Sequence, residues 1–135
     1  MRGGAIRFTV YGAPRTKKTS NQVVTKGRVR VLPSKAWMRW VKTALVVAEG
    51  RMLVDDRVCD EHCVLLNPEP YNIKATFYRD ANRGDAVGYY QGIADLLEKR
   101  HVIADDKWLV SWDGSRLEID RKNPRVEIVL TACPA

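Results

Sequence analysis

Residues 71–100 read YNIKATFYRDANRGDAVGYYQGIADLLEKR, a strand pattern followed by a charged turn and a helix pattern. Residues 71–78 alternate between apolar and polar side chains, which predicts a β-strand. Residues 79–84 form the turn, and Asp85 is a favourable helix N-cap, so we expect a helix from there to residue 100. Its apolar stripe, at spacings of three, four and three, comprises Val87, Tyr90, Ala94 and Leu97.

Strand and helix patterns continue on both sides of this unit. Strands are expected at residues 6–11, 108–112 and 124–131, and residues 23–32 resemble a hairpin. A second helix follows the N-cap Ser34 and is expected to stop at Gly50, with an apolar face made of Trp37, Trp40, Val41, Ala44, Leu45 and Ala48. This order predicts one domain over residues 1–135, of α/β (α+β) class: a small mixed β-sheet with two main helices packed on it.

The composition is that of a globular chain, with 45% hydrophobic and 29% charged residues. No apolar run approaches the roughly 18 residues of a membrane span. The opening MRGGAIRFTV lacks the apolar core of a secretory signal. We therefore expect an intracellular, cytoplasmic protein without a membrane partner.

The only cluster of cysteines is 59-CDEHC-63. It offers Cys59, His62 and Cys63, with no second pair nearby, and therefore lacks the four ligands of a structural zinc site. We expect free thiols, which fit a reducing compartment.

Charge is distributed unevenly along the chain, whose formal net charge is +7. Residues 1–48 hold eleven of the 23 basic residues and none of the 16 acidic ones. Such an asymmetry favours a polyanionic partner, and we interpret the first part of the chain as binding nucleic acid. The candidate DNA-binding side chains are Lys17, Lys18, Lys26, Arg28, Arg30 and Lys35.

Acidic residues surround the helix expected after Asp85. Asp80 lies in the preceding turn, and Asp105 and Asp106 follow the helix. If the turn and the next strand meet, Asp85 and Asp106 converge with Asp80 or Asp105 in support, and their oxygens suit Mg²⁺. Asp95 lies ten residues after Asp85, ~15 Å along a helix, which gives it a supporting role. In the alternative interpretation these carboxylates are ordinary helix caps and turn residues.

The stretch 85-DAVGYYQGIADLLEKRHVIADD-106 resembles the RusA-type crossover junction endodeoxyribonucleases, which resolve Holliday junctions. In that family an acidic cluster with an asparagine opens a helix, an aspartate-x-leucine follows on the helix, and a double aspartate comes shortly after. Asp95-Leu96-Leu97 and Asp105-Asp106 match the last two features with the family's spacing. The first half of the chain is similar in 12-GAP-14, 17-KK-18 and 33-PSK-35, so the resemblance spans nearly the whole chain and implies a RusA-like fold.

The family typically has Asp-x-Asp-Asn and then a lysine one turn later, and this chain departs from that pattern. An ungapped match places Asp85, Val87 and Gly88 at the cluster and Gln91 at the lysine.

A gapped match instead uses Asp80, Asn82 and Asp85 as the cluster. We prefer it because it keeps three oxygen ligands near the start of the helix. The lysine is absent in both matches, and Lys107, next to the double aspartate, is a candidate replacement.

The resemblance implies a phage or prophage homodimer that nicks four-way DNA junctions with Mg²⁺, or with Mn²⁺ in its place, in recombination and repair. Asp85 and Asp106, supported by Asp80 or Asp105, would hold the metal that activates water. The basic first half would hold phosphates of branched DNA.

Two other interpretations stay open. The chain is a DNA-binding protein without catalysis if its acidic residues only cap helices and form turns. It is a PD-(D/E)xK-like nuclease of a different fold if Asp105-Asp106-Lys107 is the Asp-x-Lys element and Asp85 the distant acid.

Overall fold

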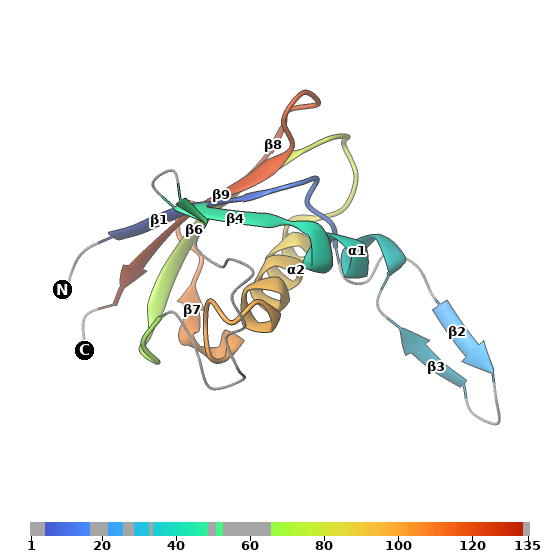
Figure 1. Ribbon diagram of the computed structural model, residues 1–135, viewed down its shortest axis with the longest axis horizontal. Helices are drawn as coiled ribbons and strands as arrows, with labels where there is room; N and C mark the ends of the chain where they lie inside the picture. Colours follow the sequence, from blue (N-terminus) through green and yellow to red (C-terminus); the bar gives the residue numbers. More distant parts are fainter. Residues whose placement is uncertain are drawn as a thin grey trace.

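The residues that the structure describes form an α+β fold with one mixed sheet, a separate hairpin and two main helices, as expected from the sequence (Figure 1). The computed structural model describes residues 5–16, 22–25, 29–32, 34–48, 51–52 and 66–133. The elements in chain order are β1 (Ala5–Tyr11), β2 (Gln22–Thr25), β3 (Val29–Leu32), α1 (Lys35–Thr43), β4 (Leu45–Ala48), β5 (Arg51–Met52), β6 (Tyr71–Arg79), α2 (Ala86–Lys99), the 3₁₀ helix η1 (Asp106–Trp108), β7 (Leu109–Ser111), β8 (Arg116–Ile119) and β9 (Arg125–Ala132).

The main sheet has seven strands in the order β5-β4-β1-β9-β6-β7, with β8 also paired to β6. Its centre is antiparallel, because β9 lies between β1 and β6 and runs opposite to both. The edge is parallel: β7 pairs with the start of β6, at Tyr71 and Leu109, and β8 pairs with its end, at Thr76 and Arg116. Residues 71–79 therefore form a strand with partners on both sides, and the strand predicted over residues 71–78 is confirmed.

The apolar core lies between one face of this sheet and the helices. Alternate residues of the central strands, such as Phe8, Ile73 and Ile128, point into it. The largest helical contributions come from Trp37 and Trp40 of α1 and from Tyr89, Ile93, Leu96 and Leu97 of α2. Figure 1 shows α2 on this side of the sheet, and the β2–β3 hairpin extending away from the body of the domain.

The helix expected to run from Ser34 to Gly50 is much shorter than predicted. Ser34 does cap it, accepting a hydrogen bond from the Trp37 N–H at 3.1 Å, but α1 ends at Thr43. Residues 45–48 form β4, which pairs antiparallel with β1. The run Leu-Val-Val fits a strand as well as a helix stripe, and pairing with β1 decides between them.

The expected helix from Asp85 to residue 100 is confirmed as α2, but its buried stripe differs from the prediction. Val87 is 72% exposed, whereas Gly92 is buried against the segment that follows β1. A Cβ atom at Gly92 would lie 2.5 Å from the Arg15 carbonyl oxygen. The indole N–H of Trp37 also donates to the Gly92 carbonyl at 3.1 Å. Glycine here lets two backbones approach, a signal that an apolar periodicity does not contain.

The hairpin within residues 23–32 is confirmed by the antiparallel pairing of β2 and β3, in which Thr25 lies opposite Val29. The strand expected over residues 108–112 is shorter, because η1 takes Trp108 and β7 ends at Ser111. The last expected strand is β9, over Arg125–Ala132. The cysteine cluster at residues 59–63 lies outside the described residues.

Candidate metal centre

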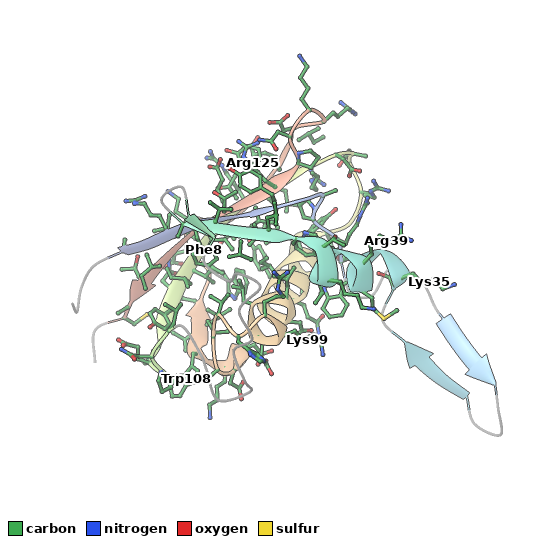
Figure 2. The ribbon with its side chains drawn as sticks, viewed as in Figure 1. Phe8, Lys35, Arg39, Lys99, Trp108 and Arg125 are labelled. Carbon is green, nitrogen blue, oxygen red and sulfur yellow. The ribbon has the colours of Figure 1, made fainter. Side chains whose placement is uncertain are left out.

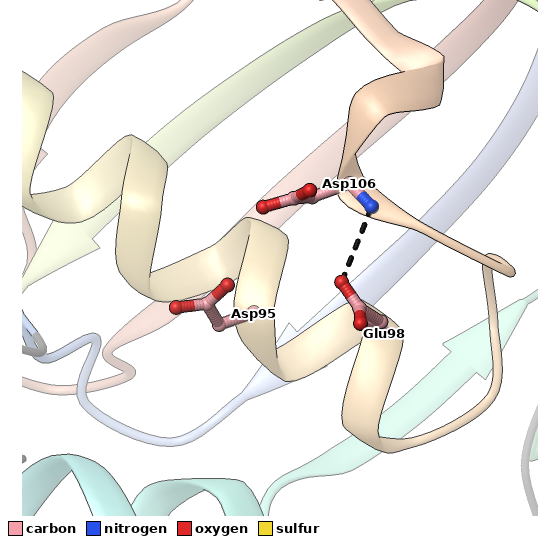
Figure 3. Close-up of side chains that lie close together, drawn as sticks. All are labelled: Asp95, Glu98 and Asp106. Atoms are coloured by element: carbon pink, nitrogen blue, oxygen red, sulfur yellow. Dashed lines mark hydrogen bonds between the residues drawn. The ribbon is translucent and has the colours of Figure 1, made fainter.

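Three carboxylates from two parts of the chain meet beside α2 (Figure 3). Asp95 and Glu98 are three residues apart on the helix, and Asp106 opens η1 across from them. One carboxylate oxygen from each side chain lies within 4.8 Å of the others. Asp95 and Glu98 are half-buried and Asp106 is exposed, so the cluster lies at the surface and can hold a metal ion.

A tight reversal after α2 brings Asp106 back to the helix. His101 adopts a left-handed conformation with φ 61°, and the N–H of the following Val102 donates to the Leu97 carbonyl at 2.9 Å. Val102 and Ile103 are then buried, which anchors the returning chain. The Asp106 N–H donates to Glu98 Oε1 at 3.2 Å, shown as the dashed line in Figure 3.

Asp105 has a structural part in this arrangement. Its side chain accepts a hydrogen bond from the Lys107 N–H at 2.9 Å and so caps η1. This hydrogen bond is the main reason that the pKa of Asp105 is lowered from its ordinary value. The double aspartate therefore opens a 3₁₀ turn ahead of β7. Asp105 caps this turn, whereas Asp106 belongs to the carboxylate cluster.

The electrostatics of the cluster favour a positive ligand. Partial loss of hydration, a hydrogen bond with Asp105 and the negative charges of Glu98 and Asp95 raise the pKa of Asp106 above its ordinary value. Several carboxylates at this separation repel one another unless a proton or a cation lies between them. A bound divalent cation would relieve that repulsion.

The structure does not bring Asp80 and Asp85 to Asp106, contrary to the expected convergence. Asp85 is the N-cap of α2 and accepts from the Gly88 N–H at 2.8 Å, whereas Asp106 contacts Glu98 near the other end. The thirteen residues from Asp85 to Glu98 span ~20 Å of helix, far beyond the reach of one metal ion.

Asp80 is engaged by arginines at the N-terminal end of α2. Both of its oxygens accept from Arg83 Nη2 at 2.9 Å, and Arg15 Nη2 lies 3.4 Å from Oδ2. The neighbouring Asn82 accepts from Arg79 Nη1 at 3.4 Å through its side-chain oxygen. Asp80 and Asn82 thus stabilise the turn, and Asp85 caps the helix. This agrees with the alternative interpretation, in which these side chains are ordinary cap and turn residues.

The remaining predicted residues are dispersed. Gln91 and Lys35 are exposed on α2 and α1 respectively. Lys107 is exposed too, with its ammonium 5.2 Å from the centre of the Trp108 ring. Among the other candidate DNA-binding residues, Arg30 belongs to β3, and Lys17, Lys18, Lys26 and Arg28 lie outside the described residues.

The sequence pattern did not indicate Glu98 as a candidate metal ligand, and it indicated only a supporting role for Asp95. The available signal was their spacing of three residues, which places both on one side of a helix. What it lacked was the reversal at His101, which selects that side for Asp106.

Comparison with known proteins adds no relative: no family model matches the chain, and no curated protein matches it either. Among the described residues, neither main helix has the length and apolar character of a membrane-crossing segment.

Proposed function

We propose that this protein is a divalent-metal-dependent endonuclease that cuts branched DNA, with four-way junctions as its preferred substrate. The observation that carries the proposal is the cluster of Asp95, Glu98 and Asp106, three oxygen donors within 4.8 Å. An oxygen-only donor set suits Mg²⁺, and Mn²⁺ as its substitute, better than zinc or copper. The resemblance of residues 85–106 to the RusA-type resolvases supports the choice of substrate.

The three carboxylates would hold the ion from two sides during phosphodiester hydrolysis. Asp95 and Glu98 would hold the ion from the helix, and Asp106 would hold it from η1. When bound, Mg²⁺ supplies charge that polarises the scissile phosphate and lowers the pKa of a water molecule. Lys107, one residue beyond Asp106 and exposed, would contact the negatively charged phosphate.

Exposed cations on α1 would hold the DNA backbone. Lys35, Arg39 and Lys42 are all exposed, at spacings of four and three residues, and therefore share one side of the helix. Figure 2 labels Lys35 and Arg39 on the side of the domain from which the β2–β3 hairpin extends. The basic residues of sequence 17–30 precede α1 in the chain and would add further phosphate contacts.

We also propose a homodimer as the working form. Symmetric cutting of a junction needs two active sites on opposed strands, and a two-fold dimer provides them.

Cleavage assays on matched substrates test the proposed function. Purified protein is incubated with synthetic four-way junction, flap and duplex DNA of shared sequence, with Mg²⁺ and with EDTA. We expect cuts in the junction with Mg²⁺ and none with EDTA. Absence of metal-dependent cleavage on all three substrates would refute the proposal.

A DNA-binding protein without catalysis is the second candidate. The observation that favours it is the engagement of Asp80 with Arg83 and of Asp85 with the α2 cap, which gives two predicted ligands ordinary structural tasks. It predicts junction binding that is equal in Mg²⁺ and EDTA, with no product in either.

A further inference from the structure

The sheet face that points away from α2 carries a row of flat side chains across its three central strands. Both helices contribute their buried apolar residues to the core on the other face. On the outer face Tyr11 of β1 lies opposite Arg125 of β9, and Arg125 lies opposite Tyr78 of β6. Figure 2 shows Arg125 on this side of the sheet. The row is therefore tyrosine, arginine, tyrosine on adjacent strands.

Contacts on several sides hold Arg125 within this row. Its guanidinium carbon lies 3.9 Å from the centre of the Tyr78 ring. It also forms ion pairs with Asp120 at 2.9 Å and with Glu127 at 2.8 Å. Because two acids pair with its single charge and hold its position, Arg125 serves here as a planar surface rather than as a free phosphate-binding cation. Tyr11, at the end of the row, is 38% exposed and offers an accessible ring.

The same face offers cations a short distance along the strands. Arg7 and Lys74 both lie opposite Val129, four residues from Tyr11 and Tyr78 respectively, which is ~13 Å along a strand. Both are exposed, and within the described part of the chain neither forms an ion pair.

The acids named on this face all have an arginine partner. Asp120 and Glu127 share Arg125, and Glu118 pairs with Arg116 at 3.1 Å. With Arg7 and Lys74 counted, the basic residues named on this face outnumber the acidic ones by four to three, and a polyanion complements the remaining positive charge.

We propose that this face binds a single-stranded segment of DNA. A base would stack on the surface formed by Tyr11 and Arg125, and phosphates of the same strand would lie near Arg7 and Lys74. Planar side chains bind unpaired bases whatever their sequence, whereas the bases of a duplex are already stacked on each other. The proposal takes DNA as the polymer from the proposed function, but it needs neither the metal nor cleavage.

Binding is measured in EDTA, by the fluorescence anisotropy of a labelled oligo(dT) strand and of a duplex of equal length. We expect the wild type to prefer the single strand. Tyr11→Ala should weaken single-strand binding about tenfold, the scale of one lost base–aromatic stack. Tyr11→Phe should bind as the wild type does, because the ring is retained. Val87→Ala, on the exposed side of α2, is the control for an unrelated surface change.

Each result decides the matter. If Tyr11→Ala binds the single strand as tightly as the wild type does, the proposal is overturned. The proposal also fails if the folded wild type does not bind the single strand. If Tyr11→Ala instead converts a dimer to a monomer in sedimentation velocity without weakening binding, the face belongs to a contact between copies and the proposal fails. Junction cleavage with Mg²⁺ is scored separately, so failure of the proposed hydrolysis leaves the EDTA result unaffected.

Discussion

Asp106 and Glu98 are joined by a hydrogen bond from the Asp106 N–H to Glu98 Oε1 at 3.2 Å. This contact links the segment after α2 to the helix and holds the two carboxylates beside Asp95. The residue that sequence reasoning selected, Asp106, thus keeps its place as a candidate ligand, but its partners come from α2 rather than from the turn before it. Substitutions in α2 and in the turn before it therefore distinguish the two sets of partners.

Divalent metal should stabilise the folded protein through the cluster. We expect added Mn²⁺ or Mg²⁺ to raise the melting temperature of the wild type, since binding to the folded state alone adds about 2.7 kcal/mol when free metal is about 100 times Kd. Glu98→Gln and Asp106→Asn should melt at the same temperature with and without metal. Asp113→Asn, at an exposed turn, should respond as the wild type does. A full response in Glu98→Gln would place the metal elsewhere.

The ion pair between Asp80 and Arg83 should make stability depend on pH. Partial burial opposes the shift, but hydrogen bonding by Arg83 and the charge of Arg15 hold the pKa of Asp80 below its ordinary value of 3.8. Because the folded-state pKa is lowered, this stabilisation is fully present above the ordinary value and is lost as pH falls through the folded-state pKa. Asp80→Asn should therefore unfold more easily at neutral pH, by under about 1 kcal/mol for so exposed a pair, and match the wild type in acid. A difference that persists in acid would contradict this assignment.

Gly92 should not tolerate a larger side chain. An alanine Cβ would lie 2.5 Å from the Arg15 carbonyl oxygen, so one backbone must move. We expect Gly92→Ala to lower the free energy of unfolding by about 1–3 kcal/mol, against the usual helical preference for alanine. Urea denaturation measures this loss, and Val87→Ala on the exposed side should change stability by less than about 0.5 kcal/mol. If Gly92→Ala is more stable than the wild type, the Arg15 backbone moves away at little cost and this prediction is wrong.

Arg100 should connect the ends of the two helices. Its Nη1 donates to the carbonyls of Val41 at 3.0 Å and Ala44 at 2.8 Å, where α1 gives way to β4. Arg100→Met keeps much of the aliphatic length but leaves these carbonyls without their charged donor, which should cost about 1.5–3 kcal/mol. Arg100→Lys should recover part of this stability in the same denaturation experiment. Equal stability of all three proteins would mean that water replaces the guanidinium.

Local sequence patterns predict most of the elements, but not the end of α1 or the strands β4, β5 and β8. The alternation of residues 71–78 and the Asp85 cap correctly predict β6 and the start of α2. The helical stripe beyond Thr43 fails because residues 45–48 satisfy helix and strand periods equally, and pairing with β1 is a non-local choice. Strands as short as β5 and β8 carry too few residues for a period to be visible.

The candidate site shows the same division. The sequence shows the carboxylate pair Asp105-Asp106 after the helix, and it also shows how many residues separate this pair from Asp85. Which side of α2 meets Asp106 depends on the left-handed backbone of His101, a conformation that is uncommon for any residue other than glycine. Glu98 therefore becomes visible only once the chain reversal is known.

Cleavage of a synthetic four-way junction by two matched amide variants tests the central claim most directly. Glu98→Gln removes a ligand charge from the cluster, whereas Asp85→Asn keeps a good N-cap on α2. With Mg²⁺ present, we predict that Glu98→Gln binds the junction but leaves it uncut, and that Asp85→Asn cuts it as the wild type does. Full cleavage by Glu98→Gln, with loss of cleavage in Asp85→Asn, would contradict a metal centre formed by Asp95, Glu98 and Asp106.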